Sequence, residues 1–387
     1  MKRLIINFTV VALLCFFACN SDDLEITVSE KFDSVINMED ISEFHFEASD
    51  INNLIRDVEY VKLEKTIQSE IQFIYKVSSS NNLILVLNLN QDRLEALLFD
   101  RSGNFKFKID YNNLDGGGAL TDVHLSNKHL TVLDNINKLI YSFDLNGNLL
   151  KQYKIDREAT NVSFDEISNR FILHSPFIQE NASNSIHFFD SELYTGWGEA
   201  ELDENYIIPV AERFHALPDG TVYYTPFSSS KVYKINPNLE IVGQIDINTQ
   251  GSGEGLKLSY DYSSTSELNN YHLDQPINML IGNEDYISIE KRTENGTFTI
   301  IYNKFNNEVY KIRHTTKLND FGDDFNFVFR KFHGSFNAGF ISYLPAIKFN
   351  QILDLAVDEE DSISEYFSHL PEVSNEDNPL LIFYSLK

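Results

Sequence analysis

Short turns in which an aromatic or aliphatic residue precedes Asp or Asn recur along this chain at a nearly constant interval. The stretch FDRSG at 99–103 returns as FDLNG at 143–147, and weaker copies stand at 189–192, 235–238 and 302–305. The second position of the motif falls at Asp100, Asp144, Asp190, Asn236 and Asn303, so successive copies are 44, 46, 46 and 67 residues apart. A period of about 40–50 residues built from short β-type segments is typical of four-stranded propeller blades. The repeat therefore predicts an all-β propeller.

The apolar-polar alternation between these turns predicts where the blades lie. Five blades are expected, each with four strands, over 73–109, 122–155, 161–197, 213–247 and 277–313. The 387 residues then form one closed body, and a hydrophobic content of 42% with 30 Phe and 19 Tyr is ample for its core.

A sixth blade is expected from both ends of the chain. Residues 325–332 and 340–343 supply its inner half, and the apolar C-terminal run 380–386 pairs with the N-terminal strand 58–63 to supply the outer half. Such a pairing closes the ring and removes its open edges. Segments 347–355 and 362–370 have helical spacing and predict a short helical insert near 347–370. The count of six follows from this closure, with five or seven blades as alternatives.

The first 18 residues have the pattern of an export signal. Lys2 and Arg3 precede an apolar run, 4–17, that is shorter than the 20 or so residues a membrane span needs. The run ends FFAC, which resembles the lipobox of bacterial lipoproteins, where the thiol of the cysteine is acylated. We therefore expect a signal peptide over 1–18, lipidation at Cys19, an acidic tether over 19–54 and the propeller over 55–387. An ordinary secretory signal is the alternative.

The net charge and the residues after Cys19 bear on location and partners. The 58 acidic and 31 basic residues give a formal charge of -27, which disfavours nucleic acid and anionic lipid surfaces as partners. The sequence NSDD at 20–23 resembles the surface-export signal of Bacteroidetes lipoproteins. It predicts an outer-membrane protein that faces the outside of the cell, with a periplasm-facing anchor as the alternative.

Three segments together resemble one family. The entry strand VEYVKLE at 58–64, the blade turns, and the C-terminal NPLLIFYSLK at 378–387 are similar to the six-bladed β-propeller lipoproteins of Bacteroidetes, a largely uncharacterised family. The resemblance spans residues 55–387 and implies the fold and the envelope location without a reaction. Members often carry a GxGPGEY stretch after the first blade, where this chain has DGGGAL at 115–120, so no role of that stretch transfers.

The connections divide into two sets. Turns between the first and second and between the third and fourth strands of each blade are short, and we call their side of the disc the short-turn face. The remaining connections form the long-loop face and are long: 110–121, 175–184, 198–212, 248–276, 290–297 and 314–324. Because long loops on a rigid scaffold commonly carry binding sites, we expect the ligand on the long-loop face.

At that face, the second strand of each blade ends near the central opening. The residues at these strand ends include aromatic and hydrogen-bonding groups that suit an oligosaccharide or a peptide. The candidate ligand-binding residues are Asp134, Asn135, His174, Phe177, Thr225, Phe227, Glu290, Arg292 and Tyr343. Each of these residues has the alternative role of plugging the channel and satisfying its neighbours.

Catalytic motifs are absent from the sequence. It has no GxSxG elbow and no HExxH zinc motif, and it predicts no cofactor and no metal site. The leading hypothesis is a lipid-anchored binding module for a glycan, a peptide or an envelope protein. Two alternatives stay open: a hydrolase or lyase that uses Asp134, Glu290 and channel histidines, and a structural partner of an outer-membrane complex.

Overall fold

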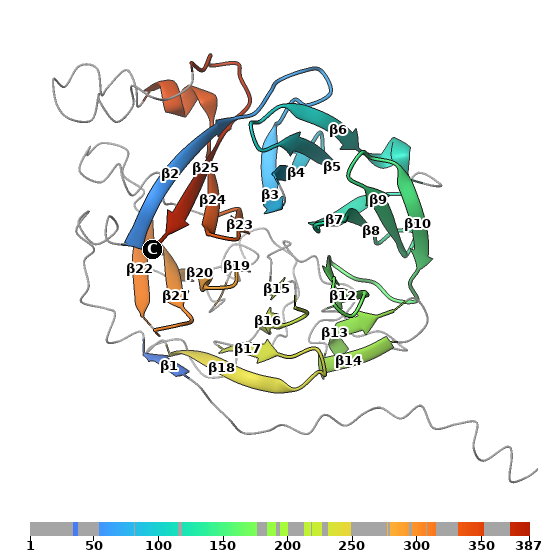
Figure 1. Ribbon diagram of the computed structural model, residues 1–387, viewed down its shortest axis with the longest axis vertical. Coiled ribbons are helices and arrows are strands. Elements are labelled where there is room, and N and C mark those ends of the chain that lie inside the picture. The colour runs from blue at the N-terminus through green and yellow to red at the C-terminus, as the bar shows by residue number, and fades with distance from the viewer. Residues whose placement is uncertain are drawn as a thin grey trace, which may run out of the picture.

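The computed structural model has an all-β architecture of six sheets arranged around a central axis (Figure 1). It describes residues 34–37, 54–80, 82–114, 118–175, 184–190, 194–199, 213–217, 219–226, 231–248, 277, 279–293, 296–306, 308–314, 332–351 and 372–387. These ranges contain the strands of a six-bladed β-propeller. The predicted fold class is therefore confirmed.

The first three blades follow the chain in order, each from its inner to its outer strand. Blade 1 consists of β3 (Phe73–Ser80), β4 (Leu83–Asn90), β5 (Arg93–Asp100) and β6 (Phe105–Ile109), and the 3-10 helix η1 (Tyr111–Asn113) follows it. Blade 2 consists of β7 (Leu120–Leu125), β8 (His129–Asp134), β9 (Leu139–Asp144) and β10 (Leu149–Lys154). Blade 3 consists of β11 (Asn161–Asp165), β12 (Arg170–His174), β13 (Asn184–Phe189) and β14 (Tyr194–Glu199).

Blades 4 and 5 continue this order. Blade 4 consists of β15 (Phe214–Ala216), β16 (Val222–Tyr224), β17 (Lys231–Ile235) and β18 (Ile241–Asn248). Blade 5 consists of β19 (Met279–Gly282), β20 (Tyr286–Thr293), β21 (Gly296–Asn303) and β22 (Val309–His314). Each of the five continuous blades begins and ends within two residues of the range predicted for it. The loop expected at 290–297 is wrong, because β20 runs to Thr293, which pairs with Gly296 at the start of β21.

Blade 6 closes the ring with strands from both chain ends. Its order is β23 (Gly334–Phe336), β24 (Gly339–Leu344), β25 (Leu380–Leu386) and β2 (Ile55–Lys62). The last pair is antiparallel, from Ile55 opposite Leu386 to Lys62 opposite Leu380. The predicted closure by the N- and C-terminal strands is confirmed.

The inner strand of blade 6 lies at a different place from the one expected. It is formed by Gly334–Phe336, whereas the prediction placed it at 325–332, of which 325–331 lie outside the described residues. A Cβ at Gly334 would lie 1.7 Å from the Val77 carbonyl oxygen, so glycine is needed for the close approach of β23 to β3. The apolar run 325–332 has a β-type pattern in the sequence. The contact between Gly334 and the Val77 carbonyl leaves no such pattern.

A further strand lies on blade 4. The segment β1 (Ser34–Asn37) pairs in parallel with the outer strand β18, from Ser34 opposite Ile245 to Asn37 opposite Asn248 (Figure 1). These residues belong to the segment expected to be a tether, where no strand is predicted from the sequence. Because β18 is otherwise an edge, β1 covers backbone groups that would be open to pairing with another chain.

The repeated turn motif has a simple physical basis. The Asp100 carboxylate accepts hydrogen bonds from the Ser102 and Asn104 backbone amides, and Gly103 has a φ of 89°. Asp144 and Gly147 repeat this arrangement in blade 2. An Asx-type turn of this kind needs a short acceptor first and a residue that tolerates positive φ fourth. The motif thus fixes the outer turns of blades 1 and 2.

The blades pack through their apolar faces. Between blades 1 and 2 the buried side chains include Leu87, Leu98, Val123 and Val132, each at most 1% exposed. Each fully buried aliphatic side chain stabilises the fold by about 1.5–3 kcal/mol. Residues 346–351 form a helical turn after β24; the rest of the expected insert, 352–370, lies outside the described residues.

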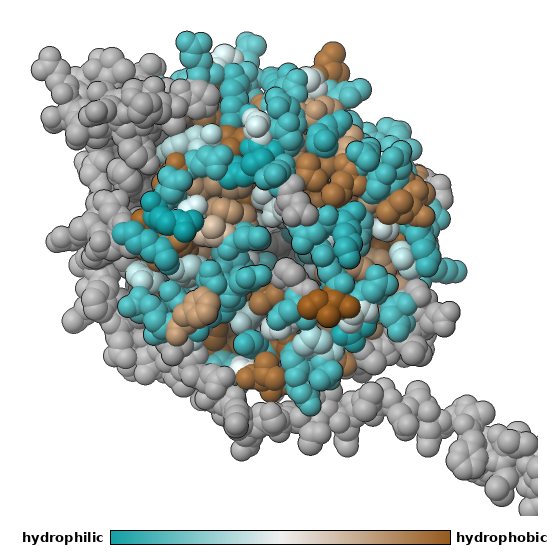
Figure 2. All heavy atoms as spheres, viewed as in Figure 1, coloured by the Kyte–Doolittle hydropathy of each residue, from teal (hydrophilic) through white to brown (hydrophobic). Residues whose placement is uncertain are grey.

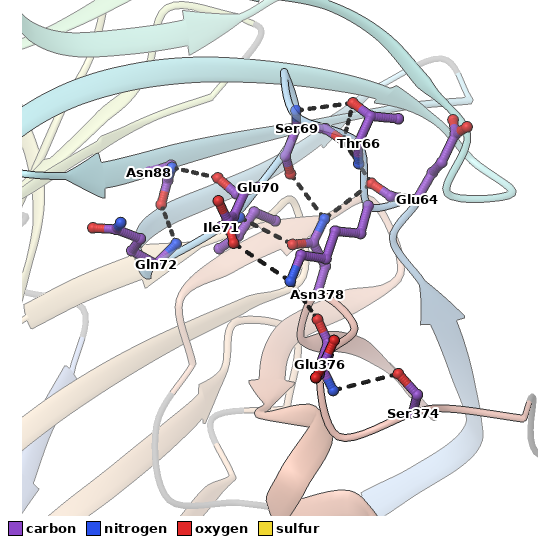
Figure 3. Close-up of polar contacts among 11 residues, drawn as sticks. Glu64, Thr66, Ser69, Glu70, Ile71, Gln72, Asn88, Ser374, Glu376 and Asn378 are labelled. Atoms are coloured by element: carbon purple, nitrogen blue, oxygen red, sulfur yellow. Dashed lines mark hydrogen bonds and ion pairs between the residues drawn. The ribbon is translucent and has the colours of Figure 1, made fainter.

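The buried side-chain amides of Asn378 and Asn88 stabilise the segment that connects β2 of blade 6 to β3 of blade 1 (Figure 3). Asn378 accepts a hydrogen bond from the Ile71 amide at 2.9 Å and donates to the Glu64 and Ser69 carbonyls. Asn88 accepts from the Gln72 and Phe73 amides and donates to the Glu70 carbonyl. The segment between β2 and β3 therefore has its polar backbone satisfied by side chains from β4 and from just before β25.

Candidate functional site

The six inner strands surround a cavity of about 280 Å³ in the centre of the disc. The cavity is lined by the C-terminal ends of β3, β7, β11, β15, β19 and β23 and by the turns that follow them. These turns belong to the short-turn face, so we call this space the short-turn cavity. In the space-filling view, hydrophilic side chains crowd the middle of the disc around a central hollow (Figure 2). The space is large enough for a small organic molecule, since one of about 150 Å³ holds benzene.

Lys76 is the single Lys or Arg among the described residues that line this cavity. Its Nζ lies 3.0 Å from the carboxylate of Asp122, which is 2% exposed. Asp122 also accepts a hydrogen bond from the Val162 amide at 2.9 Å. The carboxylate thereby joins the inner strands of blades 1, 2 and 3, and it neutralises the cation beside the cavity.

Two histidines line the cavity and are uncharged. Desolvation lowers the pKa of His124 to about 3, and the charge of Lys76 adds to the effect. Desolvation likewise lowers the pKa of His215 to about 3, with Lys304 and Lys76 contributing. His124 Nδ1 lies 3.3 Å from the Ser163 hydroxyl, a weak contact. Both rings therefore offer a neutral donor and acceptor at any pH from about 4 upward.

His215 packs against β19 in a way that depends on glycine. A Cβ at Gly282 would lie 3.0 Å from His215 Cδ2, tighter than ordinary contact. None of the described residues makes a hydrogen bond to the His215 ring. Ser335, half-buried on β23, also has no hydrogen bond to a described residue through its hydroxyl. The cavity wall thus carries hydrogen-bonding capacity that the described protein does not use.

The rim of the cavity is polar and acidic. Glu166 accepts a hydrogen bond from the Asn127 amide at 2.7 Å, which ties the first turns of blades 2 and 3 together. Asn283 is buried and donates to the Phe336 and Gly339 carbonyls, while Glu284 beside it is exposed. Phe336 adds an apolar surface, since it is half-buried and packs edge-on against Phe383. Hydrogen-bonding and apolar groups of this mixture are typical of small-ligand sites.

The sequence-predicted residues that the structure describes lie elsewhere, toward the opposite ends of the second strands. Asp134, at the end of β8, is fully buried and accepts hydrogen bonds from the Ala119 and Asn137 amides and from Asn137 Nδ2. A Cβ at Gly118 would lie 1.9 Å from its Oδ2. Both carboxylate oxygens are therefore occupied by the local backbone and Asn137, which does not favour a role as a catalytic acid or base.

Asn135, His174 and Thr225 are likewise engaged with neighbouring groups. Asn135 accepts a hydrogen bond from the Ala159 amide at 2.9 Å. His174 is 1% exposed, its Nδ1 lies 3.1 Å from the Thr160 hydroxyl, and desolvation lowers its pKa to about 3. Thr225 is fully buried and donates its backbone amide to the Arg213 carbonyl.

The remaining candidates are spread over several environments. Glu290 is half-buried on β20, opposite Met279 and Thr299. Tyr343 is half-buried on β24 with its ring 4.4 Å from His333, and burial raises its pKa. Arg292 belongs to β20, but its side chain, and all of Phe177 and Phe227, lie outside the described residues. Ligand binding by these nine residues stays a prediction.

The lining of the short-turn cavity was not selected from the sequence. One signal could have found it, because small polar residues and histidines recur at the ends of the inner strands. They are Ser78, Ser79 and Ser80 in blade 1, His124 in blade 2, Ser163 in blade 3, His215 in blade 4 and Ser335 in blade 6. The prediction from loop length instead favours the long-loop face, at the other end of the channel.

The fold and this channel define a six-bladed β-propeller with a polar central cavity. The sequence matches the family described as Domain of unknown function (DUF4934) over residues 34–385, and the chain belongs to that family. The match begins at the first residue of β1, which supports the inclusion of this strand in the domain. No curated protein matches the sequence.

Several solved structures are similar to this chain. A Bacteroides fragilis protein predicted to be exported has a TM-score of 0.65 at 13% identity, over 91% of this chain and 99% of that protein. A DUF4221 family member from Bacteroides vulgatus scores 0.48 at 11% identity, over 86% and 97% of the two chains. Virginiamycin B lyase from Staphylococcus aureus scores 0.39 at 12% identity, over 74% and 94%. Of these three, the first bears on the fold. The resemblance to Bacteroidetes six-bladed propellers is thus confirmed.

The described residues also bear on membrane insertion and metal binding. None of their helices has the length and apolar character needed to span a membrane. Within the same part of the chain, no three His, Cys, Asp or Glu side chains gather as they would around a metal ion.

Proposed function

We propose that this protein is a binding protein of the bacterial cell envelope that holds a small polar ligand in the short-turn cavity. The observation that carries the proposal is the cavity wall, where the His215 ring and the Ser335 hydroxyl have no hydrogen bond to a described residue. Buried or half-buried polar groups gain stability when a ligand supplies the missing partners. The wall is already formed by β-strands, so little ordering would oppose binding.

A cavity-filling substitution tests this site before the ligand is known. Ser335→Trp would place an indole in the cavity, and Ser102→Trp would place the same side chain on the exposed outer turn of blade 1. The full chain is applied to glycan and peptide arrays, and the affinity for each hit is measured for both variants. We expect at least a tenfold loss with Ser335→Trp and none with Ser102→Trp. Equal binding by the two variants would refute the cavity as the site.

The same experiment addresses the long-loop face. If Ser335→Trp leaves binding intact, the long-loop candidates become the next site to test. Glu290 and Tyr343 are the most suitable of these to change, because both are half-buried rather than fully enclosed. Their substitution by Gln and Phe removes the charge or the hydroxyl and nearly keeps the side-chain volume.

For location, we propose a lipid anchor at Cys19 on the outer membrane, with the propeller facing the outside of the cell. The FFAC sequence and the acidic NSDD after it support this proposal, as does the exported class of the B. fragilis protein of similar fold. Cys19→Ser should move the protein from the membrane fraction to the soluble fraction. Protease treatment of intact cells should digest the native protein if it faces outward and spare it if it faces the periplasm.

A further inference from the structure

The charges around the short-turn cavity bear on what it can hold. Lys76 is paired with Asp122 at 3.0 Å, so it does not present a free positive charge. Both lining imidazoles are neutral, and Glu166 and Glu284 place negative charge at the rim. The whole chain carries a formal charge of -27. An anionic ligand would find no unpaired Lys or Arg among the described lining residues to balance its charge.

A cationic ligand is also poorly matched. The Glu166 carboxylate already accepts the Asn127 amide, and Glu284 is exposed at the mouth, where solvent screens its charge. Glu166 and Glu284 are the only carboxylates among the described lining residues, and neither presents an unengaged, buried charge to a cation. The interior therefore has no charge partner for either sign.

The uncharged groups of the wall have the properties that ring hydroxyls need. Each neutral imidazole offers one donor and one acceptor, and a serine hydroxyl offers both. His215 and Ser335 reach the cavity from blades 4 and 6, and Phe336 beside Ser335 adds an apolar surface. A pyranose has alternating hydroxyls at its edge and apolar C–H groups on its faces, and its size suits about 280 Å³.

From this arrangement we infer that the short-turn cavity binds a neutral, hydroxyl-rich ring, such as the end of an uncharged glycan, through His215 and Ser335. The inference rests on the proposed function and gives the ligand class of the same site.

Matched sugars test the inference on the full chain. Saturation-transfer NMR titrations compare glucose, galactose and N-acetylglucosamine with glucuronic acid, which is anionic, and with glucosamine, which is cationic at neutral pH. At least one neutral sugar should bind, with a Kd of about 1 mM typical of a single ring, and glucuronic acid should bind about tenfold more weakly. Glucosamine should bind no more tightly than glucose.

Two substitutions connect binding to the named groups. His215→Phe keeps an aromatic ring without nitrogens, and Ser335→Ala removes one hydroxyl. Each should weaken the neutral sugar about fivefold, while Ser102→Ala on the outer turn of blade 1 leaves it unchanged. Thermal unfolding checks each variant, and Ser335→Ala, the smaller change, decides the result if His215→Phe does not fold.

Several outcomes would overturn the ligand class. They are the absence of binding by every neutral sugar, tighter binding of glucuronic acid or glucosamine than of glucose, and neutral-sugar affinity that is equal in wild type and Ser335→Ala. If an array ligand is still lost with Ser335→Trp in such a case, the proposed binding function stands and the inference about neutral sugars fails.

Discussion

The two ends of the propeller channel use polar side chains in opposite ways. At the second-strand ends, Asp134, Asn135 and His174 hydrogen-bond to backbone or side-chain groups nearby. At the short-turn end, the His215 ring and the Ser335 hydroxyl line a cavity without a hydrogen bond to any described residue. A list of polar residues does not separate the two groups. Polar groups that already have hydrogen-bond partners within the protein stabilise the fold, and those without such partners are available to a ligand.

The largest expected effect is at Asp134. Asp134→Ala removes an acceptor that serves two backbone amides and Asn137 Nδ2 in a fully buried place, so the donors lose their partners. We expect a loss of about 3 kcal/mol or more in the free energy of unfolding. Urea denaturation followed by circular dichroism measures it. A loss below about 1 kcal/mol would mean that the three hydrogen bonds to Asp134 contribute little to the stability of the fold.

The next effect is a loss of stability in acid, to which both ends contribute. His124, His174 and His215 have folded pKa values near 3, whereas the unfolded value is about 6.5. Between these values the unfolded chain binds more protons, so stability falls as pH drops from 6.5 toward 3, by up to about 1.4 kcal/mol per pH unit for each imidazole. Denaturation midpoints at pH 7.5, 6.0 and 5.0 measure the slope.

Substituting one histidine at a time shows how much each imidazole contributes to the pH dependence of the free energy of unfolding. The charged and titratable groups that act on them are Lys76, His129 and His215 for His124; Arg213 and His187 for His174; and Lys304 and Lys76 for His215. His215→Phe should reduce the slope by up to about 1.4 kcal/mol per pH unit, since one imidazole with a lowered pKa no longer titrates. Ser335→Ala, in the same cavity, is the control. An unchanged slope in His215→Phe would show that His215 titrates normally.

The smallest expected effect on stability is at Ser335. Its hydroxyl has no hydrogen bond to a described residue, and the side chain is half-buried, so Ser335→Ala should change the free energy of unfolding by no more than about 0.5 kcal/mol. The same denaturation experiment as for Asp134→Ala measures it. A loss as large as that of Asp134→Ala would remove the distinction between the two ends of the channel.

Local sequence was sufficient for most of the fold. The Asp100 and Asp144 turns satisfy their own amides within four residues, and the strands between them alternate in a pattern readable from the chain. The closure by β2 and β25 was also predictable, because two unpaired apolar strands remained after the other blades were assigned. The inner strand of blade 6 was not, since Gly334 owes its place to the Val77 carbonyl some 250 residues away.

The repeat and the five continuous blades follow from the sequence alone, because they depend on residues that are near one another along the chain. The tertiary structure decided the rest. In the folded ring β1 pairs with the edge of blade 4, and Asn378 accepts a hydrogen bond from the Ile71 amide. Asp134 accepts three hydrogen bonds, whereas the Ser335 hydroxyl has none to a described residue. Whether a polar group is satisfied depends on partners brought together by the closed ring, and that information is not local in the sequence.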